Sequence, residues 1–228
     1  DAFSHKGGTH IDGVIKNSAS FEHVPPEAVG GVRRTVLSEL SGRAAVTEKV
    51  EKLMPSVKLS PEEMRKIVEK LKEMESEGYQ YEGADASFEL LVRRLLGLHK
   101  SFFKLRNYKV ITSDQLPGGE ETASAIVDVW VGDAEEVTAA NGMGPVDALD
   151  SALRKALERF FPALGNMRLV DYKVRVLDSK QATASKVRVL IESSDGTSDW
   201  ITVGVSEDII QASWNALVDA HEYLLSKL

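Results

Sequence analysis

The chain has 228 residues, and its 35 acidic side chains outnumber 28 basic ones, giving a formal net charge of −7. This balance argues against a nucleic-acid partner or an anionic membrane surface, and the absence of cysteine excludes disulfide bonds and thiolate metal sites. No apolar run approaches the roughly 20 residues of a membrane-spanning helix, and no signal peptide is evident. We therefore expect a cytoplasmic protein that binds neither nucleic acid nor membrane.

Residues 1–25 are rich in glycine and have little apolar content of their own. Pro25 and Pro26 close the segment, because a residue before proline avoids the helical region. A stretch with so little core must pack on another domain or subunit. The chain also begins at Asp1 without an initiator methionine, so we expect it to be part of a longer protein.

Two histidines of this first segment, His5 and His10, precede Asp12. A histidine titrates near neutral pH, and a nearby carboxylate can orient it, so the group has the chemistry of general acid–base catalysis. The spacing matches no standard zinc pattern, and we predict no metal site. The residues alone leave a second interpretation open, in which the histidines are incidental on a surface loop.

Helical periodicity extends over residues 27–99. We predict three helices, over about 41–55, 60–78 and 85–96. Ser60-Pro-Glu-Glu63 predicts a helix start with Ser60 as the cap, Pro61 in the first position and Glu63 completing a capping box. The charged residues among these helices form a solvated face.

From about residue 101 the apolar period becomes two, which is typical of strands. The pattern predicts strands over 107–111, 125–131 and 135–140, followed by a helix that ends near Pro162. Asn141 to Leu157 carry a glycine turn that enters this helix directly. Gly142 and Gly144 permit close backbone approach, and Pro145 suits the first helical position.

The start of this helix is open to two interpretations. A helix N-terminus preceded by bare backbone can receive a carboxylate, whereas the plain alternative is a sharp strand-to-helix turn. Gly204 aligns with Gly142 in a second copy, whose helix begins with the acids Glu207 and Asp208. One terminus then favours an anion and the other a cation, which suits a zwitterionic amino acid if the two turns lie close together.

The pattern occurs twice. Asp171-Tyr-Lys-Val174 repeats Asn107-Tyr-Lys-Val110, and residues 183–189 align with residues 122–128. We predict an α+β fold in which 101–161 and 167–228 are two pseudo-symmetric βββα units. Each unit of about 60 residues would be marginal alone, so the pair forms one domain, and its junction is a usual place for a small ligand.

Several stretches resemble the 2-isopropylmalate, homocitrate and citramalate synthase family. Residues 2–17 are similar to the segment just after the catalytic barrel of that family, and residues 38–43 and 77–91 look like its linker region. Residues 169–178, 191–195 and 204–209 are most similar to the citramalate synthase branch.

The resemblance implies two small helical linker subdomains, 1–25 and 26–100, followed by a regulatory domain, 101–228, of two βββα units. The catalytic barrel would be absent, and with it the divalent metal and the acetyl-CoA site. The full-length enzyme would condense acetyl-CoA with a 2-oxo acid, giving citramalate from pyruvate. We expect a homodimer, and we expect the chain alone to hold no cofactor and to be inactive.

The resemblance also assigns site residues. His10 would enter the active site of the partner subunit's barrel, with Asp12 orienting it or a substrate group. A branched-chain amino acid, isoleucine or leucine, would bind the regulatory domain as a feedback inhibitor. The matching positions are Asn141, Gly142, Gly144, Pro145, Val146, Asp171, Tyr172, Ala182 and Ala184.

Three alternatives remain. The chain could be the regulatory region of a 2-isopropylmalate or homocitrate synthase instead. It could also be a dimerisation module without a ligand, or a stand-alone amino-acid sensor.

Overall fold

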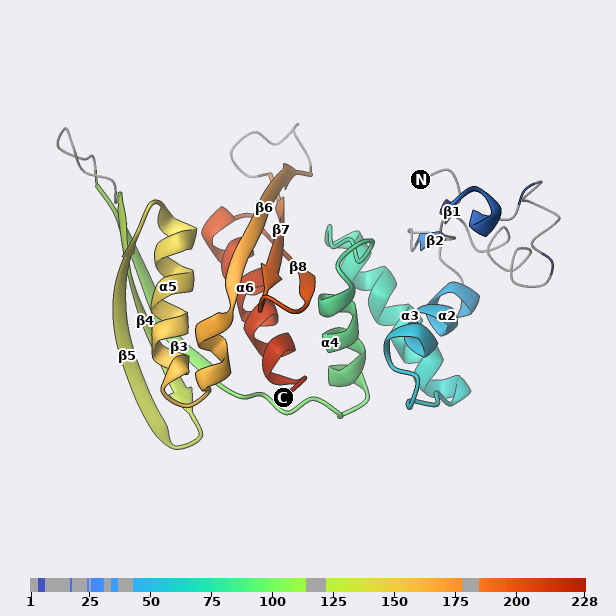
Figure 1. The fold of residues 1–228 in the computed structure, drawn as a ribbon, viewed down its shortest axis with the longest axis horizontal. Helices are drawn as coiled ribbons and strands as arrows, with labels where there is room; N and C mark the ends of the chain where they lie inside the picture. The colour runs from blue at the N-terminus through green and yellow to red at the C-terminus, as the bar shows by residue number, and fades with distance from the viewer. Residues whose placement is uncertain are drawn as a thin grey trace. The chain divides into compact units, whose positions relative to one another are not determined.

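The computed structural model describes residues 4–6, 17, 24, 26–30, 34–36, 43–113, 122–177 and 185–228. The chain divides into two compact units, Asp1–Leu96 and Gly97–Leu228 (Figure 1). The predicted boundary between linker subdomains near residue 25 stays a prediction, because that region is only partly described. Among the described helices, none combines the length and the apolar character needed to cross a bilayer.

The first unit is mainly helical. Its elements are β1 (Ser4–Lys6), η2 (Pro26–Val29), β2 (Arg34–Val36), α2 (Arg43–Leu53), α3 (Pro61–Ser76) and α4 (Asp85–Leu95). β1 and β2 form a short parallel pair. The capping box at the start of α3 is confirmed: Glu63 N donates to Ser60 Oγ at 3.3 Å, and Ser60 N donates to Glu63 Oε2 at 2.8 Å.

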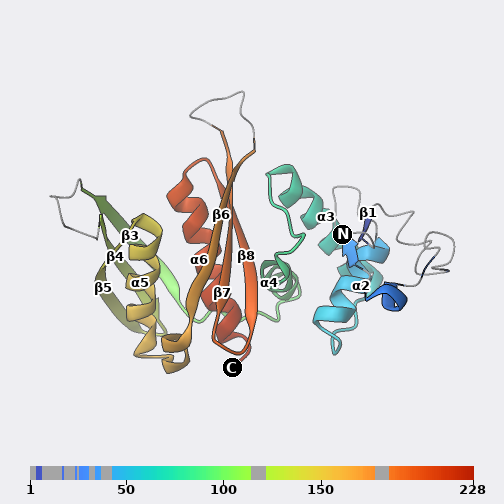
Figure 2. The same ribbon diagram turned by 45° about the horizontal axis from the view of Figure 1, so that its top comes forward.

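The second unit contains two three-stranded antiparallel sheets and two long helices. Its elements are β3 (Lys104–Thr112), β4 (Ala123–Val131), β5 (Ala134–Gly142), α5 (Pro145–Glu158), η3 (Pro162–Asn166), β6 (Arg168–Val176), β7 (Val187–Ser194), β8 (Asp199–Ser206) and α6 (Ile209–Leu225). α5 packs on the first sheet and α6 on the second (Figure 2). The predicted α+β fold with two βββα units is confirmed.

The two βββα repeats within the second unit match one another in register. Each first strand carries an irregularity at the same point, between Leu105 and Asn107 in β3 and between Leu169 and Asp171 in β6. A buried threonine of each third strand then donates to its helix. Thr138 bonds the carbonyl of Ala152 at 2.7 Å, and Thr202 bonds that of Ala216 at 2.8 Å.

This register corrects the predicted alignment of the repeats. Ala125 pairs with Ala140, and Val189 pairs with Gly204, so Gly204 corresponds to Ala140 and not to Gly142. The alignment of residues 183–189 with 122–128 was wrong for the same reason, since Val189 corresponds to Ala125. The loops before β4 and β7 differ in sequence, and the register is set by strand pairing, which periodicity does not reveal.

The first segment of the second unit is tied to its last helix. Ser101 Oγ and the backbone N–H of Phe102 donate to Glu222 Oε1, at 3.1 and 3.2 Å, and His99 Nε2 lies 3.3 Å from Glu222 Oε2. Glu222 is buried, and these bonds satisfy a carboxylate that would otherwise be costly to remove from water. The beginning and the end of the unit are therefore joined.

Candidate functional site

The predicted glycine turn lies where β5 passes into α5. Asn141 and Gly142 are the last residues of β5, Gly144 is the N-cap of α5, and Pro145 is the first helical residue, as predicted. Met143 between the glycines is exposed, and Val146 is half-buried. The turn therefore presents its backbone and an apolar side chain at the helix start.

The two glycines of the turn have different reasons to be glycine. A Cβ on Gly142 would lie 2.4 Å from the backbone nitrogen of Ala148, so the close approach of α5 to β5 requires glycine there. Gly144 has an extended backbone, φ −161° and ψ 177°, and a Cβ on it would meet nothing within 4 Å. Neither conformation nor packing requires glycine at position 144.

Three side-chain hydrogen bonds hold the turn. Met143 N donates to Asp147 Oδ2 at 2.8 Å, and Thr122 Oγ1 donates to the Met143 carbonyl at 2.6 Å. Ser124 Oγ donates to Asn141 Oδ1 at 2.8 Å across β4 and β5. Sequence reasoning missed Asp147 and Thr122. The preference for an acid in the first turn of a helix could have identified Asp147.

The equivalent helix start in the second repeat is closed by its own side chain. Asp208 is the N-cap of α6, and its Oδ1 accepts from the backbone N–H groups of Ile210 at 2.7 Å and Gln211 at 3.4 Å. Gly144 corresponds to Asp208. The last residues of β5 and β8, Gly142 and Ser206, pair with the first residues of β4 and β7, and Gly144 and Asp208 each lie two residues beyond them. α5 has no side-chain hydrogen bond at its cap, so its first N–H groups can receive an external anion.

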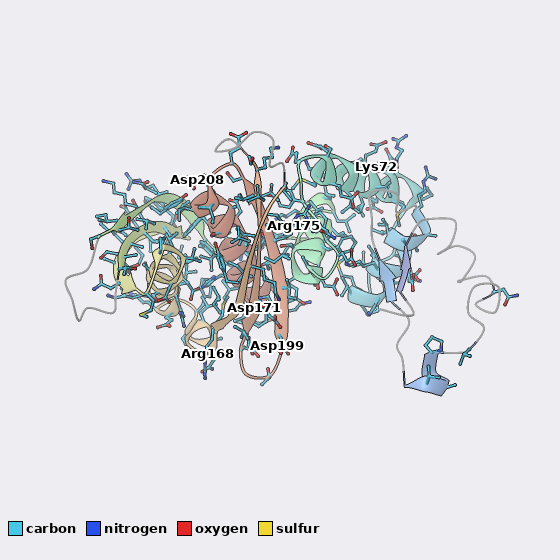
Figure 3. All side chains as sticks on the ribbon, turned by 90° about the horizontal axis from the view of Figure 1, so that it is seen from above. Lys72, Arg168, Asp171, Arg175, Asp199 and Asp208 are labelled. Atoms are coloured by element: carbon cyan, nitrogen blue, oxygen red, sulfur yellow. The ribbon has the colours of Figure 1, made fainter. Side chains whose placement is uncertain are left out.

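Asp171 and Tyr172 lie on β6 and face opposite ways, because neighbouring strand residues alternate between faces. The Tyr172 hydroxyl bonds Ser213 Oγ on α6 at 2.8 Å. The Asp171 carboxylate accepts from Lys173 on its own strand and from Tyr172 N. The hydrogen bond from Lys173 lowers the pKa of Asp171. Figure 3 marks Asp171 on β6 and Asp208 at the start of α6.

The remaining predicted site residues lie outside the described part of the chain. They are His10, Asp12, Ala182 and Ala184. Their assignment stays a prediction. Within the described ranges, no group of three carboxylate or imidazole side chains could hold a metal ion.

Comparison with known proteins matches both parts of the chain to described families. A family model for the LeuA allosteric (dimerisation) domain covers residues 82–225, and one described as homocitrate synthase post-HMGL domain-like covers residues 1–79.

Individual relatives match along nearly the whole chain. The (R)-citramalate synthase of Geobacter sulfurreducens is 48% identical over 99% of this chain and 43% of its own length. That of Aquifex aeolicus is 46% identical over the same shares. A probable 2-isopropylmalate synthase of Methanopyrus kandleri is 32% identical over 96% of this chain and 42% of its own length. The chain thus spans about two fifths of these relatives.

Proposed function

The chain belongs to the family of LeuA allosteric (dimerisation) domains, and on that premise we propose that it is the linker and regulatory region of a citramalate synthase-type enzyme. The relatives named (R)-citramalate synthase support this assignment over the 2-isopropylmalate alternative, because the two named above match with higher identity. The full-length enzyme would condense acetyl-CoA with a 2-oxo acid such as pyruvate. The divalent metal and acetyl-CoA would bind in the part of the enzyme that this chain does not contain.

The regulatory role would be the binding of a branched-chain amino acid at the start of α5. One observation carries this proposal, the contrast between Gly144 and Asp208. The same fold position holds a capping carboxylate in one repeat, whereas the other repeat leaves the N–H groups of Val146 and Asp147 without a side-chain cap. An amino acid's carboxylate would take the place that Asp208 Oδ1 takes in α6, with its tail against Val146.

The ammonium group of the amino acid needs a separate partner. Asp171 would supply it, because its carboxylate already accepts from Tyr172 N and Lys173 and keeps further acceptor capacity on both oxygens. Tyr172 is directed to α6 instead, so its contribution would be through packing.

Isothermal titration of the 228-residue chain with isoleucine, leucine and valine tests this role. We expect saturable binding of isoleucine or leucine. Gly144→Asp should abolish it by supplying an internal carboxylate, while Asp208→Gly, the matched change in the other repeat, should leave it intact. Binding that survives Gly144→Asp, or silence from all three amino acids at millimolar concentration, would contradict the effector site and favour a ligand-free dimerisation module.

The first segment would serve catalysis in the full-length enzyme. His10 would act as an acid–base group in the partner subunit's barrel, with Asp12 orienting it. His10→Ala in the full-length enzyme should mainly lower turnover by about 10²–10⁴-fold, and unchanged kinetics would remove His10 from the mechanism.

A further inference from the structure

A buried polar cluster joins the two repeats where α5 packs against α6. Asp150 and Arg154 lie one turn apart on α5, and Arg154 Nη2 donates to Asp150 Oδ2 at 2.6 Å. Arg154 Nη1 also donates to the carbonyl of Met167, just before β6, at 2.8 Å. His221 of α6 is fully buried, and its Nε2 lies 3.8 Å from Asp150 Oδ1.

No hydrogen bond joins His221 to Asp150 while the imidazole is neutral. His221 Nδ1 lies 2.9 Å from the Leu217 carbonyl, and a carbonyl only accepts, so Nδ1 donates. Neutral imidazole then has a lone pair at Nε2. In the described structure Nε2 is buried without a hydrogen-bond partner. Two acceptors therefore face one another, which is costly for buried polar groups.

The fold does not require polar residues at these places. In the register of the repeats, His221 corresponds to Leu157, Asp150 to Trp214 and Arg154 to Val218. Leu157 and Trp214 are buried apolar side chains. The same fold thus accepts apolar side chains at the corresponding positions. A buried ionic cluster generally stabilises a protein no more than well-packed apolar side chains of similar volume do. A requirement other than stability would explain the polar set.

We propose that Asp150, Arg154 and His221 form a proton-sensitive joint between the two repeats: α5 and α6 stay packed while the buried His221 is neutral, and this packing loosens when Nε2 takes up a proton from solvent. The added charge would be buried beside Arg154, whose own charge opposes it. Asp150 would offset only part of this cost, because its other oxygen already serves Arg154.

The direction of the response follows from burial. Burial lowers the pKa of His221. The negative charge of Asp150 acts in the opposite direction, and the positive charge of Arg154 lowers the pKa further. The unfolded chain therefore takes up a proton below the ordinary value of 6.5 while the folded protein does not. Stability is retained above pH 6.5 and is lost as the pH falls from 6.5 toward the folded pKa.

Other groups around α6 would not produce this response. The residues of β7 and β8 that pack toward α6 are uncharged in the described structure, among them Ser193, Trp200 and Thr202. Tyr108 of β3 stacks on α6, and burial, followed by the charge of Asp208, raises its pKa above 10.0, outside the relevant range. Glu222 is held by the segment from His99 to Phe102, which makes His99 the necessary control.

Direct titration of the ring tests the first step. In the 228-residue chain the His221 ring resonance, followed by NMR, should titrate below pH 6.5. Asp150→Asn should move the midpoint lower still, because it removes the negative charge that favours imidazolium. A midpoint at or above 6.5, or one unchanged by Asp150→Asn, would overturn the joint.

Denaturant unfolding tests the consequence. All three tryptophans, Trp130, Trp200 and Trp214, lie in the second unit, so their fluorescence reports that unit alone. The control is His221→Leu, which introduces the residue type found at the corresponding position, Leu157. For each pH unit below 6.5, the unfolding equilibrium constant of the wild type should rise by up to about tenfold relative to that of this variant. The difference in slope between wild type and His221→Leu should persist in a His99→Gln background, which removes the imidazole beside Glu222. Parallel slopes for wild type and His221→Leu would overturn the proposal. If His221→Leu does not fold, the ring titration decides.

Discussion

Gly142 and Gly144 show how one residue type can serve two purposes within three positions. Gly142 is fixed by the approach of α5, since a Cβ would meet the Ala148 nitrogen. Gly144 has ordinary extended backbone and open space around it. The first glycine is therefore required by packing, and we propose that the second leaves the helix start open for a ligand.

Alanine substitutions separate the two glycines. Gly142→Ala should destabilise the second unit by about 1–3 kcal/mol, because overpacking forces α5 away from β5. Gly144→Ala should change the stability by no more than about 1 kcal/mol, because the poorer N-cap and the lower entropy of the unfolded chain act in opposite directions. Tryptophan-monitored denaturant unfolding measures both. Equal losses would show that position 144 carries a packing constraint that its surroundings do not reveal.

At the scale of single elements, the cap of α3 is the clearest local signal in the chain. Ser60 and Glu63 bond each other's backbone, and the bond from the Ser60 backbone is the main cause that lowers the pKa of Glu63. A carboxylate with a lowered pKa stabilises the fold above its unfolded pKa. This contribution is lost as the pH falls through the folded value.

Ser60→Ala should therefore act on both stability and pH dependence. We expect α3 to lose about 1 kcal/mol at neutral pH, the usual cost of a missing serine cap. Loss of stability on acidification near and below pH 4.5, the ordinary value for Glu63, should become partly shallower, because the substitution removes the bond from Ser60 Oγ to the Glu63 carboxylate but keeps the bond from the backbone. Amide hydrogen exchange along α3 measures this locally, with Ser76→Ala at the other end of the helix as the control. An unchanged acid response would contradict the capping interpretation.

The sequence predicted the elements better than their alignment. Helix starts were predictable where a local side chain forms them, as at Ser60 and Pro145. The correspondence of Gly144 with Asp208 was not, because it depends on strand pairing between residues far apart in the chain. The polar joint of Asp150, Arg154 and His221 was also hidden. In the sequence these residues have ordinary helical spacing, and only the packing of two helices brings them together.

On the scale of the whole molecule, the match to an allosteric dimerisation domain leads to a prediction for the isolated chain. We expect light scattering to give the mass of a dimer, and we expect no condensation of acetyl-CoA with pyruvate, because the chain covers about two fifths of its relatives. The full-length enzyme assayed in parallel is the control. Measurable condensation by the 228-residue chain would require catalytic residues within it.

The bonds from Ser101 and Phe102 to Glu222 also concern the order of the chain. When the beginning and the end of a unit lie close together, its ends can be joined and new ends opened elsewhere. Joining them closes only a short loop, which costs little entropy. The second unit would then be circularly permutable. A variant that begins at β6, ends with the segment from α5 through η3 and joins Leu228 to Gly97 through a short glycine linker should fold with native tryptophan fluorescence. The Glu222→Gln permutant should be less stable, and a permutant without cooperative unfolding would show that the connection between the repeats is needed for folding.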